Sequence, residues 1–269
     1  DATGNVTVDG AVLGSGSADN CSSIDITVSP TSFDCANIGA NAVTVTVTDA
    51  SGNTASCNAT VTVADNLAPD AVCQDVTVQL DGNGDASIAA ADVDNGSSDN
   101  CAIDNMSVSP NTFDCADIGA NAVVLTVTDV NALTSTCNAT VTVEDGVAPT
   151  ALCRDITVAL DANGMATITA AQIDNGSTDN CAGSLTLAIT PNSFDCTVRA
   201  PAQVELTVTD VAGNSATCTA TVSFTENTPP TAVCQDITIQ LDGNGDASIV
   251  GADVDGGSSD NCGVATLDV

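Results

Sequence analysis

Hydrophobic and polar residues alternate in short runs along the whole chain. Residues 75–80 and 137–143 show the alternation, and so do residues 123–128, where Val123, Leu125 and Val127 are predicted to face inward. A period of two is that of a half-buried β-strand, and no segment has a helical period. The pattern predicts six or seven short strands per 80 residues, which is typical of a β-sandwich of the immunoglobulin-like class.

This pattern returns at a fixed interval. Asp92–Cys101 reads DVDNGSSDNC, and the stretch recurs at Gln172–Cys181 and Asp253–Cys262, with a divergent copy at Val12–Cys21. A strict period predicts a tandem array of all-β repeats whose neighbours meet end to end. We expect two complete repeats, at 66–145 and 146–226. The flanking repeats are expected to be partial: 1–65 lacks its N-terminal part and 227–269 its C-terminal part, so the chain is expected to be a segment of a longer protein.

Each repeat carries a turn signal after its first strand. Residues 81–84 read DGNG and residues 161–164 read DANG. Asn-Gly favours a type I′ turn, which predicts a hairpin. The start also resembles an EF-hand calcium loop, but Ala86 stands where that loop requires glycine and no downstream glutamate follows. The hairpin is the preferred interpretation.

Composition predicts thin cores that need covalent support. The chain is 43% hydrophobic but has four Phe and no Trp or Tyr, so an 80-residue sandwich is marginally stable unless it is stapled. Thirteen cysteines at regular intervals supply the staples and predict an oxidising, extracellular or cell-surface location. Histidine and CxxC pairs are absent from the sequence, which argues against zinc and iron–sulfur sites.

The geometry of an immunoglobulin-like sandwich favours particular cysteine pairs. Its first and last strands run parallel and adjacent, so Cys73–Cys137 and Cys153–Cys218 are expected. The rival Cys137–Cys153 would have to span a strand of roughly 20 Å, beyond the reach of a disulfide. The cysteines left over predict the pairs Cys21–Cys35, Cys101–Cys115 and Cys181–Cys196, with Cys57, Cys234 and Cys262 paired outside the segment.

The net charge of −33 arises from 35 acidic residues against two basic ones, Arg154 and Arg199. Repulsion excludes nucleic acid and anionic membranes as partners. The absence of an 18-residue apolar run predicts that the chain does not insert into a membrane. Such a charge disfavours the compact state unless cations or salt screen it, so the acidic loops are candidate calcium sites.

Two sets of acids are candidate ligands. Asp92, Asp94 and Asp99 place hard oxygen ligands around a glycine turn, as calcium loops do, although the same residues also form ordinary Asx turns. The equivalents in the later repeats are Asp174, Asp179, Asp253, Asp255 and Asp260. The second set lies near the repeat ends, where it could meet the next repeat or remain a solvated surface: Asp129 with Glu144 and Asp145, Asp49 with Asp65, and Asp210 with Glu226.

Catalysis is not expected. The chain has no His or Lys, and paired carboxylates for glycoside hydrolysis need a cleft that no insertion into the repeat supplies. The leading hypothesis is therefore a structural stalk of a secreted adhesin or filament. The alternatives are repeats that themselves bind a carbohydrate or protein ligand, or spacer repeats in a secreted multidomain hydrolase.

The motifs resemble a known extracellular module. The order P-x-x-x-C-x-[DN]-[IV]-T-V, DNC, FDC and TVTDxxGN…TC.ATVTV resembles the hyalin repeat family over the whole chain, most closely its tandem form in large surface proteins of gliding and marine Bacteroidota. The most specific part is the ending with Asp49, Gly52, Asn53 and Cys57, repeated at Asp210–Cys218; residues 129–137 lack its Gly-Asn.

The resemblance implies an immunoglobulin-like fold, a role in adhesion or structural spacing, and no enzymatic activity. It also implies export across the outer membrane, and a place in a surface filament or a gliding-motility adhesin. The expected partners are neighbouring repeats, other copies in a filament, and a surface or glycan at a distal tip.

Overall fold

The computed structural model describes residues 3–20, 23–198 and 200–269. The chain divides into two compact units. The first comprises residues 1–80 and 85–144 and contains the first two repeats. The second comprises residues 81–84 and 145–269 and contains the last two.

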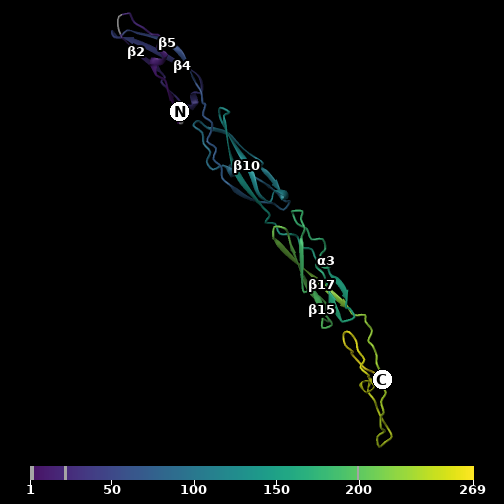
Figure 1. Ribbon diagram of the computed structural model, residues 1–269. Helices are drawn as coiled ribbons and strands as arrows, with labels where there is room; N and C mark the ends of the chain where they lie inside the picture. The colour runs from purple at the N-terminus through teal and green to yellow at the C-terminus, as the bar shows by residue number, and fades with distance from the viewer. Residues whose placement is uncertain (1–2, 21–22, 199) are drawn as a thin grey trace. The chain divides into compact units, whose positions relative to one another are not determined.

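The second repeat forms two sheets. The small sheet pairs β7 (Asp85–Ser87) with β9 (Thr112–Asp114). The main sheet has four strands (Figure 1), in the order β6 (Val76–Gln79), β11 (Thr134–Glu144), β10 (Gly119–Asp129) and β8 (Ile103–Ser109). The first strand β6 runs parallel to the last strand β11, whereas the other pairs are antiparallel.

The third repeat has the same topology. Its small sheet pairs β13 (Met165–Thr167) with β15 (Ser193–Asp195). The order of its main sheet is β12 (Ile156–Ala159), β17 (Ser215–Thr225), β16 (Ala202–Thr209) and β14 (Thr186–Thr190). The parallel pairing of first and last strands is again present.

The first and fourth repeats contain fewer strands. The first has a three-stranded sheet of β2 (Ile24–Ser29), β4 (Gly39–Asp49) and β5 (Thr54–Val63), with β1 (Val6–Thr7) paired to β3 (Ser32–Phe33). Residues 227–269 form isolated β-bridges and one helical turn, α4 (Gly251–Val254). The fold class is confirmed: the chain is a tandem array of immunoglobulin-like β-sandwich repeats joined by disulfides.

The predicted alternation is confirmed in the core. Val123, Leu125 and Val127 of β10 are fully buried, as are Val141 and Val143 of β11. The third repeat buries the equivalent Val204, Leu206 and Val208 together with Phe194. The core of the second repeat is built from aliphatic side chains around Phe113, and that of the third around Phe194 and Phe224, whose ring centroids are 4.8 Å apart. These are the thin cores that the composition predicts.

The absence of helical period did not exclude helices. Three further single-turn helices occur, α1 (Gly10–Leu13), α2 (Ala90–Val93) and α3 (Ala170–Ile173), and Cys35–Asn37 and Cys115–Asp117 form short 3-10 turns. A single turn is too short to show a period in sequence. In α2, Asp92 accepts a hydrogen bond from Ala89 N at 2.7 Å and so caps the turn.

The hairpin predicted at DGNG and DANG is wrong. The strands that flank Asp161–Gly164 belong to different sheets, because β12 pairs with β17 and β13 pairs with β15. Gly164 N donates to Asp161 O, and only the glycine has a positive φ, of 73°. Asp161 N also donates to Met165 O at 2.8 Å, so the turn closes locally, but it passes the chain from one sheet to the other and the strands on either side do not pair.

Two predicted disulfides are present. Cys73 bonds Cys137 and Cys153 bonds Cys218, each with Cα atoms 5.8 Å apart. The parallel pairing of first and last strands brings these cysteines together. Each bond closes a single sandwich.

The other predicted pairs are wrong. Cys35 bonds Cys101 and Cys196 bonds Cys262, so Cys101–Cys115, Cys181–Cys196 and Cys21–Cys35 do not form, and Cys262 is paired inside the chain. Cys21 itself lies outside the described residues. Cys115 and Cys181 are also disulfide-bonded.

The physical reason is the length of β8. Its seven residues separate Cys101 from Cys115 and span roughly 23 Å at about 3.3 Å per residue, whereas a disulfide bridges Cα atoms up to about 7 Å apart. Cys101 therefore reaches a cysteine of the preceding repeat. The bond between Cys35 and Cys101 joins two consecutive sandwiches.

One backbone position in the second repeat is strained. Ala132 has a φ of 66°, where the other repeats have Gly52 and Gly213. We expect Ala132→Gly to stabilise this repeat by about 0.5–1 kcal/mol, because glycine adopts positive φ without a Cβ clash. Thermal unfolding should show a rise of several degrees. Ala122→Gly in β10 is the control and should destabilise; equal effects of both substitutions would contradict the interpretation.

Candidate metal centre

Three carboxylates from distant parts of the sequence meet in the first unit. Asp65 precedes the second repeat, Asp99 belongs to its Asp-Asn-Cys motif, and Asp129 ends β10. One oxygen from each lies within 4.8 Å of the other two. We call these residues the first carboxylate cluster.

Local hydrogen bonds fix each carboxylate. Asp129 Oδ1 accepts from Asn131 N and Leu133 N, both at 2.8 Å, in the turn between β10 and β11. Asp99 Oδ2 accepts from Cys101 N at 2.8 Å. The Asp65 carboxylate accepts from Asn100 Nδ2 and Asn131 Nδ2. The cluster is therefore held in place by backbone and amide donors.

Two oxygens in the cluster are buried without a hydrogen-bond partner. They are Asp99 Oδ1 and Asp129 Oδ2, and Asp129 is only 1% exposed. The neighbouring Asn100 Oδ1 is likewise buried and unpartnered. Burying an oxygen without a hydrogen-bond partner costs about 1–3 kcal/mol of folding free energy, and more when the oxygen is charged. A bound cation would offset this cost.

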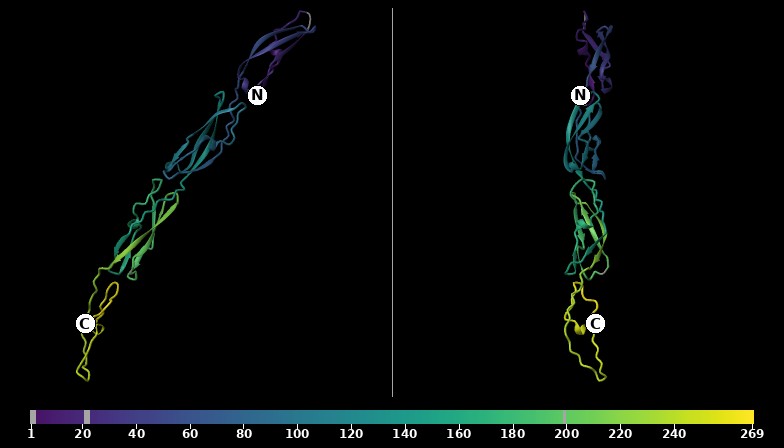
Figure 2. Two further views of the ribbon diagram at one scale, coloured as in Figure 1. Left: turned by 180° about the vertical axis from the view of Figure 1, so that it is seen from behind. Right: turned by 90° about the vertical axis from the view of Figure 1, so that its right-hand side faces the viewer.

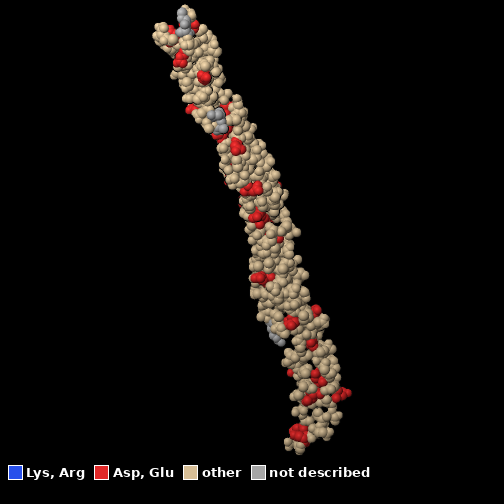
Figure 3. All heavy atoms as spheres, turned by 60° about the vertical axis from the view of Figure 1, so that its left-hand side comes forward, with Lys and Arg blue, Asp and Glu red and all other residues tan. Residues whose placement is uncertain are grey.

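No basic side chain supplies the missing charge within the described part of the chain. Arg154, its one basic residue, donates to the backbone carbonyls of Ala171 and Gln172. Carboxylates elsewhere are spread over the visible surface in Figure 3.

The donor set fits calcium. Calcium binds six to eight oxygens at about 2.3–2.6 Å, so two oxygens on one ion lie at most about 5 Å apart. The cluster meets that limit with three carboxylate oxygens. Asp65, Asp99 and Asp129 are therefore the residues that would hold the ion.

The second unit repeats this arrangement with Asp145, Asp179 and Asp210, which we call the second carboxylate cluster. Asp210 Oδ1 accepts from Gly213 N and Asn214 N, and Asp145 O accepts from Asn214 Nδ2. Asp179 Oδ1 is buried without a partner. Asp145 and Asp210 are 9% and 8% exposed.

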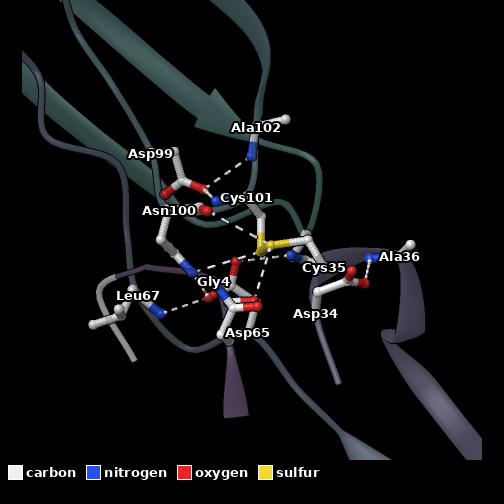
Figure 4. Close-up of a disulfide and its surroundings, with 12 residues drawn as sticks. Gly4, Asp34, Cys35, Ala36, Asp65, Leu67, Asp99, Asn100, Cys101 and Ala102 are labelled. Atoms are coloured by element: carbon white, nitrogen blue, oxygen red, sulfur yellow. Dashed lines mark hydrogen bonds between the residues drawn. A yellow bond between two sulfur atoms is a disulfide. The ribbon is translucent and has the colours of Figure 1, made fainter. Parts of the chain in front are cut away.

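The disulfide and the first cluster are adjacent. Figure 4 shows Asp99, Asn100 and Cys101 in succession, with the Asn100 side chain pointing at Asp65 and Cys101 bonded to Cys35. The Asp-Asn-Cys motif thus supplies a carboxylate, an amide that orients a second carboxylate, and a covalent bond to the preceding repeat.

The predicted acidic loop does not act as one site. Asp92 caps α2, and Asp94 accepts from Gly96 N and Ser97 N. Neither belongs to a group of three carboxylates among the described residues. Asp174 and Asp179 are likewise not part of one site, because Asp174 Oδ1 accepts hydrogen bonds from the backbone N and the Oγ of Ser177. Only the last acid of the predicted loop faces a cluster.

The prediction that the acids at the repeat ends meet the next repeat is confirmed for Asp145, which lies beside Asp179 and Asp210, but not for Asp129 and Glu144. Asp129 ends β10, whereas Glu144 ends β11, which runs back over eleven residues. The two acids therefore lie at opposite ends of the repeat, and Asp129 meets Asp65 instead of Asp145. Glu144 accepts a hydrogen bond from Gln79 Nε2 at 2.7 Å.

The outer repeats show parts of the same arrangement. In the fourth, Asp260 Oδ2 accepts from Cys262 N and its Oδ1 is buried without a partner, while Asp253 and Asp255 serve the local turn. Glu226 accepts from Thr228 N. In the first, Asp49 accepts hydrogen bonds from Ser51 N, Asn53 N and Asn53 Nδ2 in the turn after β4. The predicted partner Asp65 lies in the first carboxylate cluster instead.

The carboxylate of Asp174, in the turn that ends at Ser177, makes the stability of the third repeat depend on pH. The side-chain hydrogen bond from Ser177, helped by that residue's backbone N–H, holds the pKa of Asp174 below its ordinary 3.8. Because the folded pKa is lower than the unfolded one, the stabilisation is complete above about pH 3.8 and is lost as the pH falls through the folded pKa.

We expect Ser177→Ala to raise the pKa of Asp174 toward 3.8, so acid destabilisation of this turn begins at a higher pH. Carboxyl-carbon NMR titration measures the shift. Ser184→Ala, at an exposed position of the same repeat, is the control. An unchanged Asp174 titration in the Ser177 variant would refute the assignment.

The fold and these sites define a class: disulfide-linked, acidic, tandem immunoglobulin-like repeats. Residues 7–63 match the HYR domain family, which supports the hyalin-repeat resemblance for the first repeat. A comparison with curated proteins found no match.

Similar solved structures are protocadherin ectodomains. Protocadherin gamma B7 domains 1–4 are 10% identical, covering 88% of this chain and 76% of that one, with a TM-score of 0.38. Mouse protocadherin gamma C3 domains 1–3 are 12% identical, covering 81% and 95%, with a TM-score of 0.34. The chain spans only 39% of the protocadherin gamma B4 chain, at 15% identity, 74% coverage of this chain and a TM-score of 0.33. At such scores the likeness carries no argument, and the fold assignment rests on strand topology.

Among the described residues, no helix has the length and hydrophobicity needed to cross a membrane. The disulfides and the HYR match together support an extracellular or cell-surface protein.

Proposed function

We propose that these repeats form the structural stalk of a secreted cell-surface adhesin or extracellular filament. The repeats are those expected from the sequence, at 1–65, 66–145, 146–226 and 227–269. The observation that carries the proposal is the disulfide between Cys35 and Cys101, which joins two consecutive sandwiches. A ligand-binding module gains nothing from a second covalent link to its neighbour, whereas a load-bearing array does.

The link changes how a pulling force is carried. Without it, tension passes from one sandwich to the next through the junction peptide alone. With it, tension reaches Cys101 through a covalent bond from Cys35. The chain segment between these cysteines, which are 66 residues apart, then bears no tension and is not extended.

Calcium at the two carboxylate clusters would stiffen the peptides that lead into the second and third repeats. Each cluster combines an acid that precedes a repeat with two acids inside that repeat. An ion bound there restrains the junction peptide relative to the sandwich, because its ligands come from both. This use of Asp65 and Asp145 assigns calcium a structural role without catalysis.

The proposed setting follows from the same features. The repeats act outside the cell, contact neighbouring repeats of the chain and other copies in a filament, and present a distal tip to a surface or glycan. A place in a gliding-motility adhesin of Bacteroidota is the most specific form of this proposal. It rests on the sequence resemblance.

Single-molecule force measurement tests the stalk role. We expect an oxidised chain pulled by its ends to reach a shorter full extension than the reduced chain. The Cys73–Cys137 bond interleaves with this loop, so the measurement uses the Cys73→Ala/Cys137→Ala background, in which opening the Cys35–Cys101 loop adds up to about 230 Å at about 3.5 Å per residue. Cys35→Ser/Cys101→Ser in that background is the matched variant and should release only this loop. Equal extensions before and after reduction would refute load-bearing by the disulfides.

A further inference from the structure

The same turn follows Asp49 in the first repeat, Asp129 in the second and Asp210 in the third. In each, the backbone N–H of the aspartate donates to the carbonyl of the residue four positions later, at 3.0 Å. That residue returns its own N–H to the Oδ1 atom of the aspartate, at 2.8 Å. In the second and third repeats the turn joins neighbouring long strands, drawn in teal and in light green in Figure 2. The backbone hydrogen bonds of the three turns are therefore alike, and the turns differ in their side chains.

Asparagine occupies the position four residues after the aspartate in two of these turns. Asn53 Nδ2 donates to Asp49 Oδ2 at 2.7 Å, and Asn214 Nδ2 donates to Asp210 Oδ2 at 3.0 Å. Hydrogen bonds to an ionised acceptor are stronger than those between neutral groups. In both turns the side-chain amide thus offsets charge on the carboxylate oxygen that the backbone of the turn does not reach.

Leu133 holds this position in the second repeat and has no side-chain donor. Asp129 Oδ2 is buried without a hydrogen-bond partner, and Asp129 is only 1% exposed, compared with 8% for Asp210. The turn does contain an asparagine, but Asn131 Nδ2 donates to Asp65 Oδ2 at 3.1 Å. Within the described part of the chain, the charge on Asp129 Oδ2 is therefore not offset by any donor.

The amide of the turn also ties it to the acid at the junction in both clusters. Asn131 Nδ2 bonds Asp65 Oδ2, and Asn214 Nδ2 bonds the backbone carbonyl of Asp145 at 2.9 Å. The tie itself is therefore similar in the two clusters. The donor on Asp65 matters less to a cation than a donor on Asp129, because Asp65 is half-buried and partly screened by solvent.

A donor on the buried aspartate competes with a cation for the same negative charge. Asn214 Nδ2 already offsets part of the charge of Asp210, whereas the charge of Asp129 Oδ2 is available in full. Opposite charges attract more strongly where the local dielectric constant is low, as at a buried carboxylate. A hydrogen bond to a charged group is worth about tenfold or more in an equilibrium constant, so the two clusters should differ in affinity by about this factor.

We propose that the residue four positions after the buried aspartate sets the calcium affinity of each cluster. The first cluster, with Leu133, binds calcium about tenfold more tightly than the second, with Asn214. Neither residue is a ligand, because each acts through its aspartate. The inference rests on the proposed calcium role of the clusters and makes the response graded: as calcium rises, the peptide that leads into the second repeat is restrained before the peptide that leads into the third.

A calcium titration of the purified, oxidised chain, followed by backbone-amide NMR, reports the two clusters separately. The Asn131 amide, which donates to Asp129 Oδ1, reports the first cluster, and the Gly213 amide, which donates to Asp210 Oδ1, reports the second. We expect the Asn131 signal to reach its midpoint at about tenfold lower free calcium than the Gly213 signal. Equal midpoints, or the reverse order, would overturn the ranking.

Leu133→Asn supplies the donor that the first cluster lacks. It should raise the calcium midpoint of the Asn131 amide about tenfold, while the Gly213 midpoint stays constant as an internal reference. Leu133→Ala is the matched control, because it removes the leucine without adding an amide, and its midpoint should remain near that of the wild type. Equal shifts in the two variants would assign the effect to lost leucine packing and refute the role of the donor.

The donor is also tested without calcium. In EDTA, the Tm of the first unit, followed through the Asn131 amide, should be several degrees higher in Leu133→Asn than in Leu133→Ala, because the new amide offsets the buried charge of Asp129. A Tm of Leu133→Asn at or below that of Leu133→Ala would overturn the inference. A titration in which neither amide responds to calcium would instead overturn the proposed calcium role, and the affinity ranking with it.

Discussion

Replacing both cysteines of the disulfide bond within the second repeat, Cys73→Ala/Cys137→Ala, is expected to lower the free energy of unfolding of that repeat by about 4 kcal/mol. The bond closes a loop with a separation of 64 residues, and the loss of chain entropy in the unfolded state gives this magnitude. An 80-residue sandwich loses about 4–8 °C in Tm per kcal/mol, so a fall of about 15 °C or more is expected.

Hydrogen exchange of the backbone amides in β10 and β11 measures the loss of stability in the second repeat itself. The control is chemical reduction: once the wild-type chain is reduced, it should unfold at the same temperature as the reduced variant, since the covalent bond is the source of the difference. If the Tm of the variant stays below that of the wild-type chain after both are reduced, the loss of stability comes from side-chain packing and not from the disulfide. A variant within a few degrees of the oxidised wild type would show that the aliphatic core suffices.

The sequence was sufficient for the fold because its signals are local and repeated. Alternation identified the inward faces of β10 and β11, and the 80-residue period identified the repeats. The Cys73–Cys137 bond followed from the position of two strands in one sandwich. Single-turn helices and the sheet-to-sheet turn at Asp161–Gly164 escaped prediction, because four residues show no period and a turn signal does not say what its flanking strands pair with.

The disulfides between repeats escaped prediction for a different reason. The one bond between repeats that the sequence argument weighed, Cys137–Cys153, is rejected by length, and the same length argument also rejects Cys101–Cys115 across β8. Applying that argument to every pair would have left Cys101 without an internal partner and pointed to the preceding repeat.

The carboxylate clusters depend on contacts between segments that no local motif reveals. Asp65, Asp99 and Asp129 are about 30 residues apart in sequence and meet only because β8 begins, and the antiparallel β10 ends, next to the junction. Spacing alone joined Asp99 to Asp92 and Asp94, which serve local turns. The recurrence of TD before the β10–β11 turn was the available signal for Asp129.

The first cluster predicts opposite effects of one substitution with and without calcium. In wild type, calcium at about 100 times its Kd should contribute about 2.7 kcal/mol, or a rise of roughly 10–20 °C over EDTA for a repeat of this size. Magnesium should not replace it, because it demands a tighter octahedral shell and dehydrates reluctantly.

Asp129→Asn should abolish most of this rise in the first unit. Asparagine keeps an oxygen for the Asn131 and Leu133 backbone donors, so the turn is preserved. It removes one of three ligand charges, which weakens calcium binding. In EDTA the same substitution should stabilise the unit, because it relieves repulsion with Asp65 and Asp99 and its amide can donate to the unpartnered Asp99 Oδ1.

Asp104→Asn provides the matched control, since it removes one negative charge from an exposed position on β8 and should leave the calcium response intact. Asp210→Asn should abolish most of the calcium-dependent rise in Tm of the second unit and leave that of the first unit unchanged. Melts that coincide in calcium and EDTA, or a full calcium response in Asp129→Asn, would show that the clusters are not calcium sites. The sign reversal in EDTA is the sharper test, because general damage to the fold would lower stability in both conditions.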